Sequence, residues 1–408
     1  MIFKQYRNIS SGYPRQFWYL SGGMLISAIG GSMVWPFLTI YIRQRLGAPL
    51  TTVTLLLTLN SGIGLVTTFI AGPIADRLGR KGVMLASLLV SSMAFAAMNW
   101  GSTLLYWAVL ISISGAFGPL FRVGSDAMVA DLVEPDRRAE AYALLRMSNN
   151  LGIAIGPAVG GFMAAASYTI ALFSASAADI IFVLLILFFV AETLPKRQNI
   201  VLDAIPDSGY QHMLKDKLFL VFIGLYALAV IPASLVMVLL PVYAKEQFHI
   251  IESQYGFIMA TNAAMVVIFQ YAITKVTKRY PNLQMLVFGA LFYALGAGTI
   301  ALDHTFFSFI LSMVIVTIGE MILVPTGTTF TANQAPPEMR GRYMGVFSLT
   351  WGISFGIGPV LGGYLNDNLA PVAIWYGGLL IGLLAMLGFI LLRKVSQKSI
   401  NRHSVISD

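Results

Sequence analysis

The sequence predicts an all-α membrane protein with twelve transmembrane helices arranged as two pseudo-symmetric six-helix bundles. Three observations predict this fold: a very apolar composition, twelve apolar runs of membrane-spanning length, and a second half that repeats the first. Hydrophobic residues make up 57% of the 408 residues and charged residues only 11%, and the mean hydropathy is +0.77. Because a soluble domain carries about a quarter charged residues, lipid is expected to surround most of this chain.

The apolar runs are long enough to cross a bilayer, which takes about 20 residues per helix. They lie at 17–42, 51–75, 82–100, 103–130, 140–166, 170–192, 216–244, 253–275, 284–302, 305–331, 341–365 and 371–392. The first run follows Lys4, Arg7 and Arg15 and continues to Ile42 without a small-residue cleavage site. It is therefore interpreted as a retained helix and not as a signal peptide.

Lys and Arg collect in the tails and loops of one side of the predicted membrane. The loops of the other side hold only Arg43, Arg45 and Lys245. Since cytoplasmic loops carry the excess of basic residues, we expect a multi-pass protein of the cell (inner or plasma) membrane with both termini in the cytoplasm. The same distribution accounts for the net charge of +8 without a nucleic-acid partner.

The second half of the chain repeats the first at an offset of 202 residues, as these pairs show: Tyr41 and Tyr243, Asn60 and Asn262, Gly156-Pro157 and Gly358-Pro359, Gly160-Gly161 and Gly362-Gly363. The polar stretch 193–215 lies between the halves. The predicted organisation is an N-terminal bundle over 1–192, a cytoplasmic linker over 193–215, and a C-terminal bundle with a cytoplasmic tail over 216–408. Parallel duplication of six helices is a transporter architecture, with the substrate site near the bilayer midplane.

The loop after the second run reads Gly72-Pro-Ile-Ala-Asp76-Arg77-Leu-Gly79-Arg80-Lys81. Gly72 and Asp76 share a helix face, and Gly72 permits a neighbouring helix to approach closely. An ordinary positively charged loop is the alternative reading. The segment resembles the G-x-x-x-D-R-x-G-R-K signature of the major facilitator superfamily. The resemblance implies the major facilitator fold and a cytoplasmic gating cluster in which Asp76 and Arg77 meet Asp131, at the end of the fourth run.

Glycines recur at every fourth position of the fifth run: Gly152, Gly156 and Gly160, with Pro157 and Gly161 beside them. Tight helix packing with a proline bend explains this stripe physically. The pattern G-x-x-x-G-P-x-x-G-G also resembles the motif that marks the drug:proton antiporters of the superfamily, which have twelve helices and belong to the DHA1-like type. That resemblance implies export.

Five ionisable residues lie within the predicted spans: Arg122, Asp126, Arg146, Asp179 and Glu320. Each costs about 3 kcal/mol at the bilayer centre, so each is expected to have a partner or to face water. Arg122 and Asp126 share a helix face and can pair, which by itself would only brace the bundle. Arg122 also resembles the helix-4 arginine that the family associates with proton transfer.

Glu320 has no basic residue near it in the sequence, and an unpaired carboxyl in a low-dielectric site can carry a proton. Its surroundings resemble helix 10 of bacterial multidrug exporters, where a glutamate serves proton coupling. The proton-coupling residues predicted here are Glu320, Asp126 and Arg122, although a hydrogen-bonded structural glutamate is the alternative. The candidate residues for the substrate cavity are Tyr41, Asn60, Arg146, Tyr243 and Asn262.

These features predict a secondary active transporter that exports amphipathic or cationic small molecules in exchange for protons, by alternating access. Its partners would be a small-molecule substrate, protons and the lipid bilayer, and a monomer is expected. The sequence has no cysteine and only scattered His, so no cofactor or metal is expected. There is no G-x-x-x-x-G-K-[ST] loop for ATP, so a gradient must supply the energy.

Three alternatives remain open from the sequence. The first is an exporter of a sugar, metabolite or lipid, and the second is a non-transporting receptor on the same fold. The third is an intramembrane enzyme, although the clustered catalytic groups that it needs are not visible. Substrate-dependent proton movement in vesicles distinguishes these classes.

Overall fold

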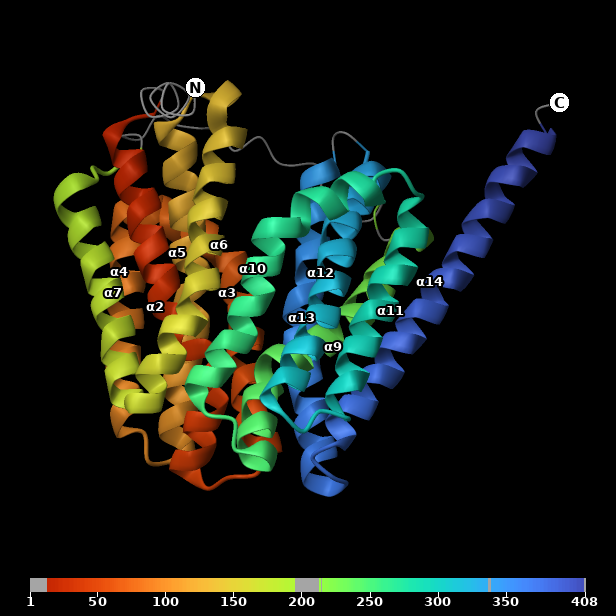
Figure 1. The fold of residues 1–408 in the computed structure, drawn as a ribbon. Coiled ribbons are helices and arrows are strands. Elements are labelled where there is room, and N and C mark those ends of the chain that lie inside the picture. The colour runs from red at the N-terminus through yellow and green to blue at the C-terminus, as the bar shows by residue number, and fades with distance from the viewer. Residues whose placement is uncertain (1–12, 195–212, 214, 337–338, 407–408) are drawn as a thin grey trace. The chain divides into compact units, whose positions relative to one another are not determined.

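A computed structural model of the chain describes residues 13–194, 213, 215–336 and 339–406. Within these residues every regular element is a helix, and twelve of the helices are long (Figure 1). Most of the predicted linker, together with Lys4, Arg7, Lys196 and Arg197, lies outside the described residues.

Each predicted run corresponds to one long helix. The helices are α2 (Arg15–Leu46), α3 (Leu50–Leu78), α4 (Arg80–Ala97), α5 (Leu104–Leu132), α6 (Arg138–Ala166), α7 (Tyr168–Phe189), α9 (Lys217–Phe248), α10 (Glu252–Thr277), α11 (Asn282–Ile300), α12 (Phe306–Gln334), α13 (Arg340–Asn368) and α14 (Ala373–Ile406). Eleven of them are long and apolar enough to cross a membrane. Helix α6 has 29 residues and is not among the eleven.

Local sequence signals set several of the helix ends. Thr103 and Asp216 accept hydrogen bonds from backbone N–H groups in the first turns of α5 and α9. Thr305 and Ser308 form a reciprocal capping box at the start of α12. Gly47 ends α2 with a left-handed φ of 58°, a conformation that glycine adopts without steric cost. The chain therefore turns where the side chains can satisfy the free backbone groups of the helix ends.

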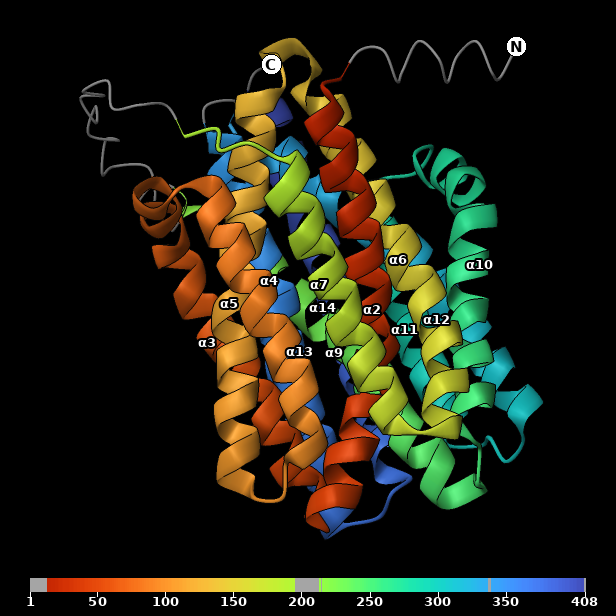
Figure 2. The ribbon, with the colours of Figure 1, turned by 90° about the vertical axis from the view of Figure 1, so that its left-hand side faces the viewer.

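Two compact units make up the chain. The first contains α2, α4 to α7, residues 59–78 of α3 and the first turns of α10 up to Ala260. The second contains α9, α11 to α14, the first turns of α3 up to Thr58, and the remainder of α10. In the first unit α2 packs against α6 and α7, and α4 packs against α5 and α7 (Figure 2). In the second, α11 packs against α12 and α14, and α9 packs against α13 and α14.

The first turn of α3 is held in the second unit by the carboxylate of Asp367, at the end of α13. Asp367 accepts hydrogen bonds from the backbone N–H groups of Leu50 (3.2 Å) and Thr51 (2.7 Å) and from the Thr51 hydroxyl (2.6 Å). The first turn of α10 is held in the first unit, where the Tyr168 hydroxyl donates to the Glu252 carboxylate. Each unit thus includes a short segment from the opposite half of the sequence.

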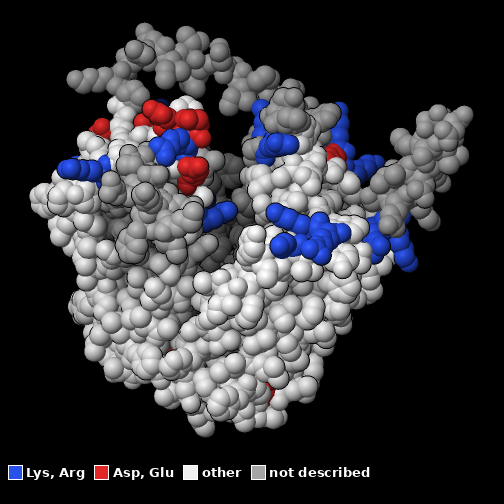
Figure 3. Space-filling model, turned by 45° about the horizontal axis from the view of Figure 1, so that its top comes forward, with Lys and Arg blue, Asp and Glu red and all other residues white. Residues whose placement is uncertain are grey.

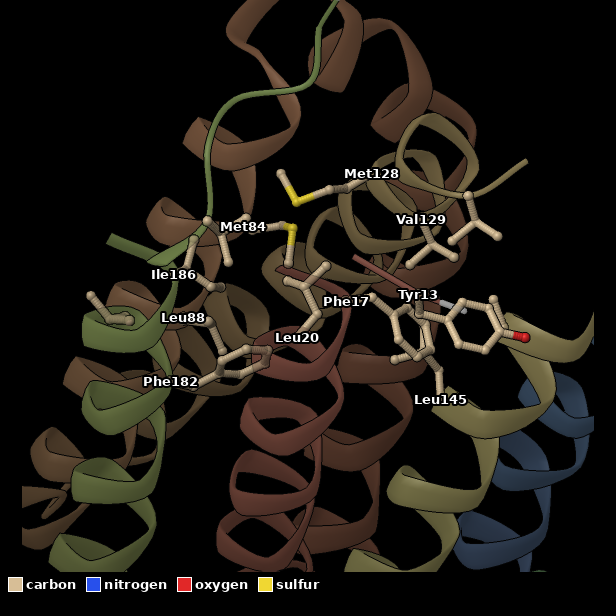
Figure 4. Packing of buried hydrophobic residues seen from close by; sticks show 14 residues of the cluster. Tyr13, Phe17, Leu20, Met84, Leu88, Met128, Val129, Leu145, Phe182 and Ile186 are labelled. Atoms are coloured by element: carbon tan, nitrogen blue, oxygen red, sulfur yellow. The ribbon is translucent and has the colours of Figure 1, made fainter. Parts of the chain in front are cut away.

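An apolar core near one end of the first unit joins five helices (Figure 4). Phe17 of α2, Met84 of α4, Met128 of α5, Leu145 of α6 and Phe182 of α7 are all buried in it. Close packing of such large side chains restricts the motion of the helix ends that carry them. This core therefore supports the start of α4 and the end of α5, where the loop motif ends and Asp131 lies.

Large apolar side chains cover the outer sides of the helices, as expected for surfaces in contact with lipid. Phe69 is 76% exposed and Phe188 is 72% exposed. Charged side chains gather toward one end of the helices in Figure 3, and the sides in that view are almost free of them. The chain is therefore a multi-pass membrane protein.

Candidate functional site

Glu320 lies on α12 inside the second unit and is bound by an amide. The Asn262 Nδ2 atom on α10 donates to Glu320 Oε2 at 2.8 Å and is 3.0 Å from Thr317 Oγ1. Thr317 in turn donates to the backbone oxygen of Met313 at 2.7 Å, which fixes its hydroxyl against α12. Two of the residues singled out in the sequence, Glu320 and Asn262, are thus brought together.

Two tyrosines complete the surroundings of this carboxyl. Tyr226 of α9 and Tyr293 of α11 are buried and interact electrostatically with Glu320. The Tyr226 hydroxyl has no hydrogen-bond partner within the described chain. No ion pair of Glu320 with Lys or Arg is found among the described residues. A carboxyl held by neutral groups can gain or lose a proton without breaking an ion pair.

The repeat-related asparagine of the first half has a different partner. Asn60 Nδ2 donates to the backbone oxygen of Ile111 on α5 at 3.1 Å. The position that corresponds to Glu320 at the 202-residue offset is Gly118. The same asparagine therefore binds the backbone in one copy and an ionisable side chain in the other.

The predicted gating cluster is centred on Arg80. Its guanidinium lies 3.5 Å from Asp76 and 3.1 Å from Asp131. The Thr193 hydroxyl, just after α7, also donates to Asp131 at 2.9 Å. Arg77, which the resemblance placed in this cluster, is exposed, and the ion pairs to Asp76 and Asp131 are made by Arg80 instead. A Cβ atom built on Gly72 meets no heavy atom within 4 Å, and the close helix approach expected at Gly72 is not found in the described chain.

Glu192 is part of this cluster and was missed by the sequence reasoning. Its carboxylate accepts hydrogen bonds from the backbone N–H groups of Arg80 and Lys81, both at 3.0 Å, and so caps the start of α4. It also accepts from the N–H groups of Thr193 (2.9 Å) and Leu194 (3.0 Å). Gly79 has a φ of 87°, and a Cβ atom there would collide with this carboxylate. A lone acid after an apolar run is too common a signal to identify a partner 112 residues away.

Replacing Glu192 by glutamine is expected to lower the free energy of unfolding of the purified protein at neutral pH by about 1 kcal/mol, the usual cost of losing a helix cap. Partial burial raises the pKa of Glu192, but the four backbone N–H bonds outweigh it, so the pKa lies below the ordinary value of 4.5. The stabilisation by the charged form is complete above the pKa of the unfolded chain and is lost as the pH falls through the lower folded pKa. The difference in the free energy of unfolding between Glu192→Gln and wild type should therefore become smaller at acidic pH.

Thermal unfolding in detergent, from neutral pH to about pH 4, measures this effect. The exposed Glu134 provides the control, since Glu134→Gln should change stability little at any pH. A Glu192→Gln variant as stable as wild type at neutral pH contradicts the capping role.

The glycine stripe of α6 packs on α2. A Cβ atom on Gly152 would lie 2.5 Å from the Ala28 Cβ, one on Gly156 would lie 2.8 Å from the Ile29 oxygen, and one on Gly160 would lie 2.6 Å from the Met33 Cα. The Ser32 hydroxyl bridges the two helices by donating to the Gly152 oxygen at 3.0 Å. The stripe therefore brings two helix backbones into direct contact.

The remaining glycine of that motif faces a different helix. A Cβ atom on Gly161 would lie 2.5 Å from the backbone oxygen of Glu252, and one on Gly256 would lie 2.8 Å from the backbone oxygen of Pro157. Helix α6 is thus fitted against α2 on one side and the first turns of α10 on another.

The two charged residues in the middle of α5, Arg122 and Asp126, are exposed in this structure. Arg122 and Asp126 interact electrostatically, but no ion pair between them is found among the described residues. The Tyr142 hydroxyl donates to the backbone oxygen of Asp126 at 2.9 Å. Arg146 is exposed as well.

The two predicted cavity tyrosines are buried among aromatic rings. Tyr41 is 6% exposed, with its ring centroid 5.8 Å from that of Trp107 and 5.0 Å from that of Tyr168. Tyr243 is 5% exposed and lies 5.1 Å from Trp375, again between centroids. Both side chains contribute to packing in this structure.

The sequence is similar to known membrane transport proteins. The sequence model of the Major Facilitator Superfamily matches residues 20–234 and 222–405. A Na(+), Li(+), K(+)/H(+) antiporter of Planococcus maritimus is 25% identical over 377 residues, with 85% of this chain and 86% of that protein covered. Multidrug resistance protein MdtH of Edwardsiella ictaluri is 28% identical over 382 residues, with 90% and 91% covered.

Solved structures share the fold. The nucleoside transporter NupG superposes with a TM-score of 0.78 at 14% identity, over 93% of this chain and all of that one (100%). A peptide transporter, POT, superposes with a TM-score of 0.76 at 17% identity, over 94% and 95% of the two chains. At these identities the likeness concerns the fold alone.

Proposed function

Since the chain belongs to the Major Facilitator Superfamily and is a transporter, not an enzyme, we propose that it is a proton-coupled exporter of amphipathic or cationic small molecules. The observation that carries the proposal is the Glu320 carboxyl, which is bound by the Asn262 amide inside a helix bundle and has no ion pair within the described chain. The resemblance to multidrug resistance protein MdtH supports the drug-like substrate class.

In this mechanism the proton on Glu320 changes the contact between α10 and α12. The ionised carboxylate accepts a strong, charge-assisted hydrogen bond from Asn262, whereas the protonated carboxyl is a weaker acceptor and becomes a donor itself. Protonation of Glu320, together with Asp126, favours one facing state, and substrate favours the other. The exposed Arg122 lies close enough to Asp126 to influence its charge.

The proposed architecture is two six-helix bundles, over 1–192 and 216–408, joined by the linker 193–215. A repeated hydrogen bond supports it: Ser32 donates to the Gly152 oxygen in the first unit, and Ser234 donates to the Ser354 oxygen in the second, both at 3.0 Å. We place the protein in the cell membrane as a monomer with both termini cytoplasmic, because of the basic loops on one side. The cluster of Asp76, Arg80 and Asp131 then acts as a cytoplasmic gate.

Proteoliposomes with an imposed pH gradient test this function. Fluorescent amphipathic cations are expected to accumulate on the acidic side in the presence of the protein and to release protons in exchange. Neutral sugars and lipids, offered in parallel, represent the other export class. If none of these compounds moves when the pH gradient is imposed, the proposal is wrong.

A second candidate is exchange of an alkali cation for protons. It is favoured by the Planococcus maritimus relative, which is named as a Na(+), Li(+), K(+)/H(+) antiporter. In the same vesicles, adding Na⁺, Li⁺ or K⁺ would then dissipate the pH gradient without any organic substrate. Dissipation by the alkali cations and not by the amphipathic ones would select this candidate over the first.

A further inference from the structure

Asp179 is a second carboxyl inside a helix bundle, and the mechanism above does not use it. It lies on α7 in the first unit and is 2% exposed. Its Oδ1 atom accepts a hydrogen bond from the Ser27 hydroxyl of α2 at 2.6 Å. The Ser91 side chain of α4 also lies beside this carboxyl. Its Oδ2 atom is buried and has no hydrogen-bond partner in the described chain.

The helix faces around Asp179 are tightly packed. On α2, Gly23 and Gly30 flank Ser27 on the side that meets α7. A Cβ atom on Gly23 would collide with the Phe182 ring, and one on Gly30 would lie 2.7 Å from the Ala178 Cβ. One turn from Asp179, the Ser176 and Ser92 hydroxyls are 2.8 Å apart and join α7 to α4. Little room is left beside the carboxyl for a hydrated ion.

Charged groups on the neighbouring helices lie far along them from this position. Helices α2 and α4 carry charged side chains only near their ends, at Arg15, Arg43 and Arg45 and at Arg80 and Lys81. Ser91 is ten residues from Lys81, which is about 15 Å along a helix. Helix α6 carries Arg138, Glu140 and Arg146, and Tyr19, Tyr41, Tyr142 and Tyr168 are the phenols of these helices and α7. The interactions found for Asp179 in the described chain are with Ser27 and Ser91 only.

An ionised Asp179 would therefore be a buried charge whose Oδ2 atom has no hydrogen bond and which has no counter-ion among the described residues. Buried charges are otherwise paired or neutralised, because the loss of hydration is not repaid. A proton on Oδ2 neutralises the group and leaves Oδ1 as the carbonyl oxygen. That oxygen accepts from Ser27 in either form, so protonation of Oδ2 keeps the observed hydrogen bond.

We propose that Asp179, with Ser27 and Ser91, is a second proton-binding site of the transporter, located between α2, α4 and α7. Loss of that proton would place a charge against the α2–α7 contact and weaken it. Since α2 also packs on the glycine stripe of α6, the proton at Asp179 controls how firmly α2 is held between its two neighbours. This role in transport rests on the proposed function, whereas binding of the proton does not.

Infrared difference spectroscopy of the purified full-length protein in lipid tests the site directly. The C=O stretch of a protonated carboxyl is expected at neutral pH in wild type and to be lost in Asp179→Asn. In Ser27→Ala the same band should move to higher frequency, because the carbonyl oxygen loses a hydrogen bond. Ser87→Ala changes a buried α4 serine one turn from Ser91 for which no contact with Asp179 is found in the described chain, and it should leave the band unchanged.

Glu320→Gln distinguishes proton binding at Asp179 from the proposed function. This variant should lose proton-coupled transport but keep the infrared band of Asp179. The proposal is overturned if Asp179→Asn and wild type have the same carboxyl bands. It is also overturned if the band disappears on replacing choline with Na⁺ or Li⁺ at constant pH, since the site would then hold an alkali cation. If Asp179→Asn does not fold, the frequency shift in Ser27→Ala decides the question alone.

Discussion

Replacing Glu320 by glutamine is expected to abolish substrate accumulation driven by a pH gradient while exchange without a gradient continues. Glutamine keeps the size of the side chain and its hydrogen bond to Asn262 but cannot bind a proton. One pH unit is worth about 1.4 kcal/mol per proton, so one-for-one exchange of a neutral substrate yields about tenfold accumulation. In the variant the ratio should fall to about one. Flux assays in proteoliposomes with the membrane potential clamped measure both quantities.

Asp303→Asn is the matched control for this experiment. Asp303 is a carboxyl of the same unit, 4% exposed, on the loop between α11 and α12. Burial raises its pKa, and Ser312 and Ser308 hydrogen-bond to it. Because it lies outside the helices, its replacement should leave the accumulation ratio unchanged. Wild-type accumulation by Glu320→Gln would exclude Glu320 as the coupling group.

Substituting Gly160 by alanine is expected to destabilise the protein by about 1–3 kcal/mol, the usual cost of overpacking a close contact. The new Cβ atom would lie 2.6 Å from the Met33 Cα, so a backbone on α2 or α6 must move. Flexible side chains cannot relieve this contact, because the nearest atoms belong to the main chain. Thermal unfolding in detergent measures the loss, and the transport rate should fall with it.

Gly22→Ala on α2 is the control, because nothing lies within 4 Å of a Cβ atom there. Alanine favours a helix over glycine by up to about 1 kcal/mol, so this variant should be as stable as wild type or more stable. The change in stability relative to wild type is therefore expected to have opposite signs in the two glycine variants. Equal stability of Gly160→Ala and Gly22→Ala would show that the stripe is not a close-packed contact.

The sequence predicted the helices well because apolar length is a local property. It also singled out Glu320, from its isolation in an apolar run, and Asn262, from the repeat, and their roles in transport stay predictions. Their hydrogen bond was not predictable, because it joins positions 58 residues apart on different helices. Hydropathy gives the position of a helix along the chain but not the direction in which each residue faces.

The gating cluster shows the same limit. The resemblance implied that Arg77, with Asp76, meets Asp131, whereas the ion pair to Asp131 is made by Arg80. The start of α4 at Arg80 and its cap by Glu192 decide which arginine points toward Asp131. The cavity role of Tyr41 and Tyr243 stays a prediction, since both lie among aromatic rings and Tyr41 also lines a small pocket with Tyr168.

The first turns of α3 and α10 have a consequence for protein engineering. Each belongs to a unit formed mainly by the other half of the chain. Thr51 of α3 is bound by Asp367, and Glu252 of α10 is bound by Tyr168. Chimeras that join the first half of this protein to the second half of a relative would therefore separate both pairs. Grafting residues 49–58 and 251–260 with the halves that bind them keeps the hydrogen bonds intact. Recombination libraries should take these two segments, and not the linker alone, as crossover boundaries.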